Sequence, residues 1–338
     1  MQCTNCHTDL EVGEMFCGNC GTPVSVQQAT PLISSPPPPP SPPSPSIPMA
    51  SSPPVQRGNY GAEISRRNPA CLVFLVDQSG SMEEEIAGGA GGKKKDVVAD
   101  AINRLLYNLV LRCTKESGVY PYFDIGMWSY SGSDSVQSAF GSGLVSIAEI
   151  SNRTKRMETR RKKVPDGAGG VYEEEMPFPI WFDAAANGLT PMRGAFNTVT
   201  TTVQSWVGQH PASFPPIVIN LTDGAYTDGD PKSVAWHLMG LGTNDGNALI
   251  FNCHISGQSG ASVQFPNDSQ AAALQGLARE LYEMSSPMPE KMLHYAIEKG
   301  YQVGTGARGY VFNADLVTMI DFLEIGSRAQ LSDRSERG

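Results

Sequence analysis

The chain has 338 residues and a formal charge of −9 at neutral pH. This length allows one large domain or two ordinary ones, with a sizeable hydrophobic core. The acidic balance argues against general affinity for nucleic acid backbones, which depends on Lys and Arg, and favours protein partners.

The first 24 residues contain two CxxC pairs, formed by Cys3 with Cys6 and by Cys17 with Cys20. Two such turns, ten residues apart, place four thiolates around one tetrahedral Zn²⁺. We therefore predict a zinc ribbon over residues 1–24. Because so small a segment has no core of its own, its folding and Zn²⁺ binding are expected to be one event. His7 is the weaker ligand candidate, since four cysteines complete the tetrahedron.

Residues 25–60 are rich in proline and serine, and many of the 26 prolines lie between Pro31 and Pro54. This composition favours extended polyproline II, so we predict a disordered, semi-rigid linker. A tether is the simpler interpretation of this segment. Recognition by a proline-binding domain is the alternative.

The N-terminus lacks the basic and apolar regions of a secretory signal, and no apolar run reaches the roughly 18 residues of a membrane span. We therefore predict a cytoplasmic protein. In that compartment the CxxC pairs indicate metal binding rather than disulfides. Cys71, Cys113 and Cys253 lie in apolar surroundings and are predicted to be buried structural thiols.

Apolar runs at 71–76, 216–221 and 248–255 are typical of strands buried on both faces. Three- and four-residue spacing of apolar residues predicts helices over 97–110 and 192–207. Further elements are expected as helices at 231–240, 270–284, 288–299 and 314–325, and as a strand at 122–130. Alternation of strands and helices predicts an α/β fold, a doubly wound, mostly parallel sheet flanked by helices, over residues 68–326. Residues 327–338 are expected to be a disordered tail.

Oxygen-bearing side chains follow the predicted buried strands. Asp77, Ser79 and Ser81 come directly after the first apolar run, and Asp223 follows the second. Thr190 lies in the loop that opens the helix near Met192. Ligands of open parallel sheets bind beyond the carboxyl ends of the strands, so these five oxygens are expected to converge. Two carboxylates and three hydroxyls suit Mg²⁺ or Mn²⁺ better than zinc.

The DxSxS motif, with a separate Thr and a separate Asp, resembles the metal-ion-dependent adhesion site of von Willebrand factor A domains, and all five positions match. The resemblance implies that Ser79, Ser81 and, in the open form, Thr190 bind the metal directly. It implies that Asp77 and Asp223 act largely through water. Few direct anionic ligands would leave the cation electrophilic, so that a partner's Asp or Glu can take the vacant position.

A narrower resemblance, to TerY-like bacterial A domains of stress-response and tellurite-resistance gene clusters, is carried by DQSGSM, KKKDVVADAINRLL, VPDGAGG, FPIWF and Thr190-Pro191-Met192. It implies a PP2C-type phosphatase and a protein kinase as candidate partners. The predicted function is a metal-dependent protein interaction module in phosphorylation-linked signalling. The alternative is an adaptor for a MoxR-type AAA+ ATPase.

Neither a glycine-rich motif nor the histidines of the chain change this interpretation. Gly304-x-Gly306-x-x-Gly309 matches a dinucleotide fingerprint, but a strand-like YVF follows it instead of a helix. The histidines lie away from any nucleophile motif, so the protein is not expected to be an enzyme.

Residues 150–180 combine basic, Gly-rich and acidic runs. They are predicted to form a solvated insertion near the metal face, with a partner-specificity loop as the alternative.

We predict that Asp77→Ala or Ser79→Ala abolishes Mg²⁺ binding and leaves the fold intact, because these residues belong to loops at the sheet edge. Isothermal titration with Mg²⁺ measures the first effect and circular dichroism the second. Loss of the native dichroism spectrum would show that the residue has a structural role as well.

Overall fold

In this computed structural model, the described residues are Gln2 and 50–327, with gaps at 87–91, 134, 142, 166–170 and 257–260. The chain divides into two compact units, Met1–Ser46 and Ile47–Gly338. The four cysteines of the predicted zinc site, most of the predicted linker and residues 328–338 lie outside the described residues. Within the described part, no helix is both long enough and apolar enough to cross a bilayer.

The second unit is built on one eight-stranded sheet. Five parallel strands form its centre, in the spatial order β14 (Tyr310–Phe312), β12 (Leu249–His254), β9 (Ile217–Thr222), β1 (Ala70–Asp77) and β4 (Phe123–Ser131). Antiparallel strands complete the two edges: β13 (Val263–Gln264) beside β14, and β5 (Ser135–Ser138) and β6 (Val145–Ser146) beside β4. The prediction of a mostly parallel sheet is confirmed.

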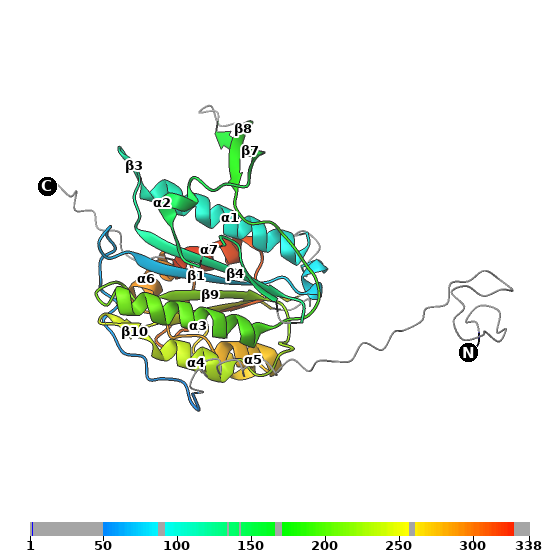
Figure 1. The fold of residues 1–338 in the computed structure, drawn as a ribbon, viewed down its shortest axis with the longest axis vertical. Helices are drawn as coiled ribbons and strands as arrows, with labels where there is room; N and C mark the ends of the chain where they lie inside the picture. Colours follow the sequence, from blue (N-terminus) through cyan, green and yellow to red (C-terminus); the bar gives the residue numbers. More distant parts are fainter. Residues whose placement is uncertain are drawn as a thin grey trace. The chain divides into compact units, whose positions relative to one another are not determined.

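Helices cover both faces of the sheet (Figure 1). On one face lie α1 (Lys94–Cys113), α6 (Glu290–Glu298) and α7 (Leu316–Gly326), which bury apolar side chains against alternate strand residues such as Phe74. On the other lie α3 (Met192–Gln209), α4 (Lys232–Gly240) and α5 (Gly276–Glu283), against the intervening residues such as Val73. Every residue of β1, β9 and β12 is therefore buried, which explains why these strands are largely apolar.

The predicted helix at 270–284 is wrong in its middle. The structure has a short 3-10 helix, η2 (Gln270–Ala273), then an extended stretch at Leu274 and Gln275, and then α5. Gly276 opens α5 with a φ of +54°, a conformation that glycine adopts without steric cost. The apolar spacing continues across this break, so periodicity alone does not reveal it.

Residues 53–64 belong to the folded unit, although residues up to 60 fall in the predicted linker. The Asn59 and Tyr60 N–H groups donate to the Asp245 carbonyl oxygen at 2.9 and 3.1 Å. Tyr60 and Ile64 are buried. Asp245 lies in the turn between β10 (Gly242–Thr243) and β11 (Gly246–Asn247). This turn therefore fixes the point at which the chain enters the domain.

The insertion at 150–180 follows a short helix, α2 (Ile147–Ile150), and forms an antiparallel hairpin of β7 (Arg156–Pro165) and β8 (Val171–Ile180), which projects from the α1 side in Figure 1. Its foot is fixed by Asn103 of α1, whose Oδ1 accepts the Trp181 and Phe182 N–H groups at 2.9 and 3.0 Å. Arg161 and Glu175, paired across the strands, are exposed. Another small hairpin, β2 (Thr114–Lys115) with β3 (Gly118–Val119), follows α1.

We expect Asp245→Ala to lower the free energy of unfolding by about 1 to 2 kcal/mol. Its carboxylate accepts the Gly61 and Ala62 N–H groups at 2.9 and 3.0 Å, and the substitution removes both bonds. Urea denaturation followed by circular dichroism measures the change, with Glu63→Ala, an exposed acidic residue of the same segment, as control. Equal losses in both variants would contradict an anchoring role for Asp245.

Candidate metal centre

The order of the central strands creates a crevice at one point of the sheet. From β1 the chain continues to β4 on one side, whereas β9 lies on the other side of β1. The loops leaving β1 and β9 therefore diverge at their carboxyl ends, which is where open α/β sheets bind ligands. Asp77 is the last residue of β1, Thr222 is the last residue of β9, and Asp223 follows it directly. The predicted ligands accordingly lie at this crevice.

The Asp77 carboxylate is fully buried and held by two donors. Its Oδ1 accepts the Ser79 N–H at 2.8 Å, and its Oδ2 accepts the Thr222 hydroxyl at 2.6 Å. Burial raises the pKa of Asp77 from 3.8 to about 6, although these hydrogen bonds oppose the shift. Removal of this side chain would leave the buried Ser79 N–H without an acceptor and would take from the Thr222 hydroxyl the shorter of its two bonds. The expectation from the sequence that Asp77→Ala leaves the fold unaffected is therefore revised: this substitution should cost stability, whereas Ser79→Ala should not.

Ser79, Ser81 and Asp223 form a continuous chain of oxygens. The Ser79 and Ser81 Oγ atoms are 3.1 Å apart, and the Ser81 hydroxyl donates to Asp223 Oδ1 at 2.8 Å. A 3-10 helix, η1 (Gly80–Glu83), places Ser81 beside the end of β9. A hydroxyl that donates its proton to a carboxylate keeps its lone pairs for a cation.

Thr190 reaches this chain from a third loop. The Gly188 carbonyl accepts the Gly80 N–H at 2.9 Å, so the loop lies against the first one. Gly188 has a φ of +70°, and a Cβ there would lie 2.7 Å from Gly132 Cα, so no other residue fits. A Cβ on Gly224 would lie 3.4 Å from Ser81 Oγ and 3.7 Å from Thr190 Oγ1. The two hydroxyls therefore face the same small space.

The Thr190 loop is also tied to the loop after β9. The Thr190 N–H donates to Thr227 Oγ1 at 3.0 Å, and the Thr227 N–H donates to the Thr190 carbonyl at 2.9 Å. Asp228 accepts the N–H groups of Arg193 and Gly194 in the first turn of α3, at 3.1 and 2.7 Å. The structure thus brings together all five predicted residues.

Sequence reasoning missed Lys94, the first residue of α1. Its ammonium, 3% exposed, donates to Asp223 Oδ2 at 2.7 Å and to Glu84 Oε2 at 2.8 Å. Burial lowers the pKa of Lys94, but the bonds to Asp223 and Glu84 outweigh that effect and raise it. The only sequence signal is its place in the lysine run Lys93–Lys95, where nothing distinguishes it from its neighbours.

The residues present fit a hard divalent cation. Two carboxylates and three hydroxyls gather at one edge, and hard oxygens are the ligands of Mg²⁺ and Mn²⁺. Among the described residues, this edge included, no three His, Cys, Asp or Glu side chains form a group able to hold a metal, so an ion here would depend on the hydroxyls. Because both oxygens of each aspartate already accept protein donors, the hydroxyls are the better candidates for direct ligation.

Two further sequence expectations can be compared with the structure. Cys71, Cys113 and Cys253 are buried free thiols, and burial raises the pKa of each, as expected of structural cysteines. Gly309 leads directly into β14, and a Cβ there would lie 2.2 Å from the Phe251 ring. This glycine therefore allows close packing at the sheet, and no helix follows it.

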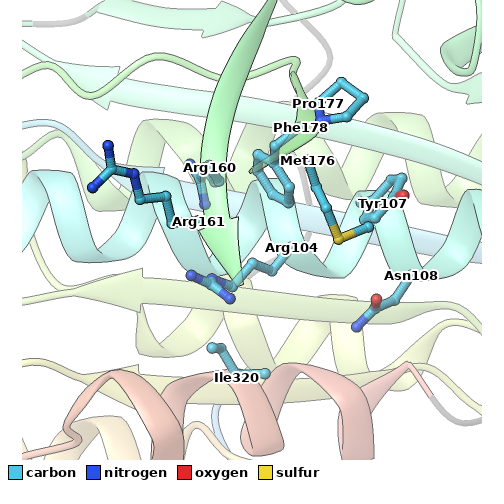
Figure 2. Close-up of a pocket in the computed structure, with 9 residues that line it drawn as sticks. All are labelled: Arg104, Tyr107, Asn108, Arg160, Arg161, Met176, Pro177, Phe178 and Ile320. Atoms are coloured by element: carbon cyan, nitrogen blue, oxygen red, sulfur yellow. The ribbon is translucent and has the colours of Figure 1, made fainter. Parts of the chain in front are cut away.

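A cavity of about 350 Å³, lined by none of the five predicted ligand residues, lies at the foot of the β7–β8 hairpin (Figure 2). Its lining comes from α1, α7 and the hairpin, and comprises Arg104, Tyr107, Asn108, Arg160, Arg161, Met176, Pro177, Phe178 and Ile320. The arginines already have carboxylate partners: Asp100 pairs with Arg104 and Arg160, and Glu175 with Arg161. Arg160 also stacks on Phe178, with 3.6 Å to the ring centroid. Each arginine of the cavity is thus paired with a carboxylate.

Residues 2–24 match the family model of a zinc-ribbon domain, which places such a domain at the N-terminus. No curated protein matches the sequence.

Similar solved structures include proximal thread matrix protein 1 from the mussel byssus, with 14% identity over 56% of this chain and 37% of that one, at a TM-score of 0.32. The vWF domain of the pilus tip protein Mfa5 from Porphyromonas gingivalis has 13% sequence identity over 48% of this chain and 40% of that domain's chain, at a TM-score of 0.28. The PilB minor pilin from Streptococcus sanguinis has 12% sequence identity over 77% of this chain and 61% of the pilin, at a TM-score of 0.41. The chain spans less than two thirds of each, and similarities this low carry no functional inference.

We expect the stability of the native protein to fall between pH 6.5 and 4 because of His254, at the carboxyl end of β12. Burial, and then the charge of Lys94, lower the pKa of His254 from 6.5 to about 4. The unfolded chain therefore binds a proton at a pH where the folded protein does not, so stability is lost as the pH falls. As the pH falls across this interval, the free energy of unfolding should decrease by roughly 2 to 3 kcal/mol more in the wild type than in His254→Gln.

Urea denaturation at a series of pH values measures this difference, with His237→Gln on α4 as control. The raised pKa of Asp77 has the opposite effect, since it favours the folded state as the pH falls. This contribution is the same in all three proteins and therefore cancels when their stabilities are compared. Parallel pH profiles for wild type and His254→Gln would contradict the prediction.

Proposed function

We propose that residues 68–326 form a von Willebrand factor A-type module that binds a protein partner through Mg²⁺ or Mn²⁺. The observation that carries the proposal is the convergence of Asp77, Ser79, Ser81, Thr190 and Asp223 at the carboxyl ends of β1 and β9. The proposed direct ligands are the three hydroxyls, with Asp77 and Asp223 acting through water. Zn²⁺ is the proposed ion of the N-terminal ribbon, held by Cys3, Cys6, Cys17 and Cys20.

Hydroxyl ligation supports a binding role because neutral ligands do not cancel the charge of the cation. Such an ion keeps affinity for an anionic oxygen, which an Asp or Glu of a partner supplies. Catalysis is not part of the proposal, because the proposal assigns the serine hydroxyls beside these carboxylates to the metal ion. The module is proposed to act in the cytoplasm, in a TerY-like bacterial stress-response system with a PP2C-type phosphatase and a protein kinase.

Ser79→Ala is the sharpest test of this function. The Ser79 hydroxyl lies beside the Ser81 hydroxyl and the Asp77 carboxylate. When it is removed, Asp77 keeps the Ser79 N–H and the Thr222 hydroxyl as donors. We expect the variant to keep the wild-type dichroism spectrum and to lose Mn²⁺ binding by at least about 100-fold, as measured by the electron paramagnetic resonance signal of free Mn²⁺. Ser117→Ala, at an exposed serine, is the control.

Partner binding is tested with the same pair of variants in a lysate capture read by mass spectrometry. Chelators are avoided because they would also remove zinc from the ribbon. A phosphatase or kinase retained by wild type and Ser117→Ala, but lost from Ser79→Ala, supports the proposal, whereas an ATPase in its place points to an adaptor. Normal Mn²⁺ binding by Ser79→Ala would overturn it, as would identical partners for all three proteins.

A further inference from the structure

Lys94 places a fixed positive charge against one proposed metal ligand residue. Its ammonium is 2.7 Å from Asp223 Oδ2, and the side chains of Lys94 and Asp223 are 3% and 0% exposed. Lys93 and Lys95, on either side of it, bind Glu83 instead and are 47% and 22% exposed. One lysine of three is thus directed into the site.

The buried ammonium changes the charge that an entering cation meets. Asp77 and Asp223 supply two negative charges, and Lys94 cancels one of them at hydrogen-bond distance. Glu84, the second partner of Lys94, is 65% exposed, so solvent screens its charge. A divalent cation beside Asp223 is therefore attracted less strongly than the two carboxylates alone would attract it.

In the metal-free protein the same ammonium has a stabilising effect. A buried carboxylate without a counter-charge is strongly destabilising, and Lys94 supplies that counter-charge for Asp223. The Lys94 N–H also donates to the Glu84 carbonyl at 2.9 Å, so the backbone contact between η1 and α1 does not depend on the side chain. Substitution of the side chain therefore alters the charge and leaves this contact in place.

We propose that Lys94 is a built-in counter-cation of the metal centre, which keeps Asp223 paired without metal and thereby weakens the affinity for the divalent ion. This proposal rests on the proposed function, because it assumes that the five oxygens bind a metal. The residue makes the site exchangeable: the domain folds with or without the ion, and the ion binds reversibly.

The test compares Lys94→Met with Lys95→Met in the full chain, with the ribbon zinc retained. Both variants lose one positive charge in the first turn of α1, but only the first loses the contact with Asp223. Each protein is exchanged into buffer without divalent cations and titrated with Mn²⁺, read by the paramagnetic resonance signal of the free ion. We expect Lys94→Met to bind Mn²⁺ at least about tenfold more tightly than wild type, and Lys95→Met to stay within about twofold.

Stability supplies a second readout. Without Mn²⁺, Lys94→Met should unfold at lower urea than Lys95→Met, and saturating Mn²⁺ should raise its midpoint by more than that of wild type. If Lys94→Met folds only with Mn²⁺, the proposal is supported, since the ion then replaces the ammonium. Unchanged or weaker Mn²⁺ affinity in Lys94→Met, or a chain that stays unfolded at saturating Mn²⁺, overturns it. Failure of wild type itself to bind Mn²⁺ overturns the proposed function and this inference together.

Discussion

The structure of the candidate site depends on the burial of two carboxylates at one edge of a parallel sheet. Asp77 and Asp223 are shielded from water, and a buried anion is tolerated only where donors or cations surround it. The Ser79 N–H, the Thr222 hydroxyl, the Ser81 hydroxyl and Lys94 supply those partners. The loops around the site follow paths that bring these groups within hydrogen-bond distance.

The fold makes this arrangement possible because β1 and β9 are neighbours whose following loops run in different directions. Helices on both faces bury the strands completely, so the polar groups of the centre concentrate where the strands end. The close approach of Gly188 to Gly132 then lets the Thr190 loop lie against the DxSxS loop. Hydroxyls from separate parts of the chain meet at one point as a result.

Two metal chemistries are proposed for one chain, and they differ in what folding requires. Four soft thiolates suit Zn²⁺, and a ribbon of some 20 residues has little core without its ion. The oxygen site lies on a domain with a large core of its own, and Lys94 pairs its buried charge when no ion is bound. We therefore propose a structural role for zinc and an exchangeable role for Mg²⁺ or Mn²⁺.

The sequence determined the fold class and the main strands and helices, because largely apolar runs identify strands buried on both faces. It also predicted the five oxygen residues that lie together at one edge of the sheet, because ligands of open parallel sheets bind beyond the strand ends. It did not determine the break at Gly276, since apolar spacing continues across it, nor the anchoring of Tyr60 by Asp245, since these residues are far apart in sequence. Lys94 could not be recognised from the sequence either, because it lies between two other lysines, Lys93 and Lys95, and nothing in the sequence distinguishes it from them. Only the direction in which α1 leaves the site turns Lys94 inward and its neighbours outward, and that direction is set by tertiary packing.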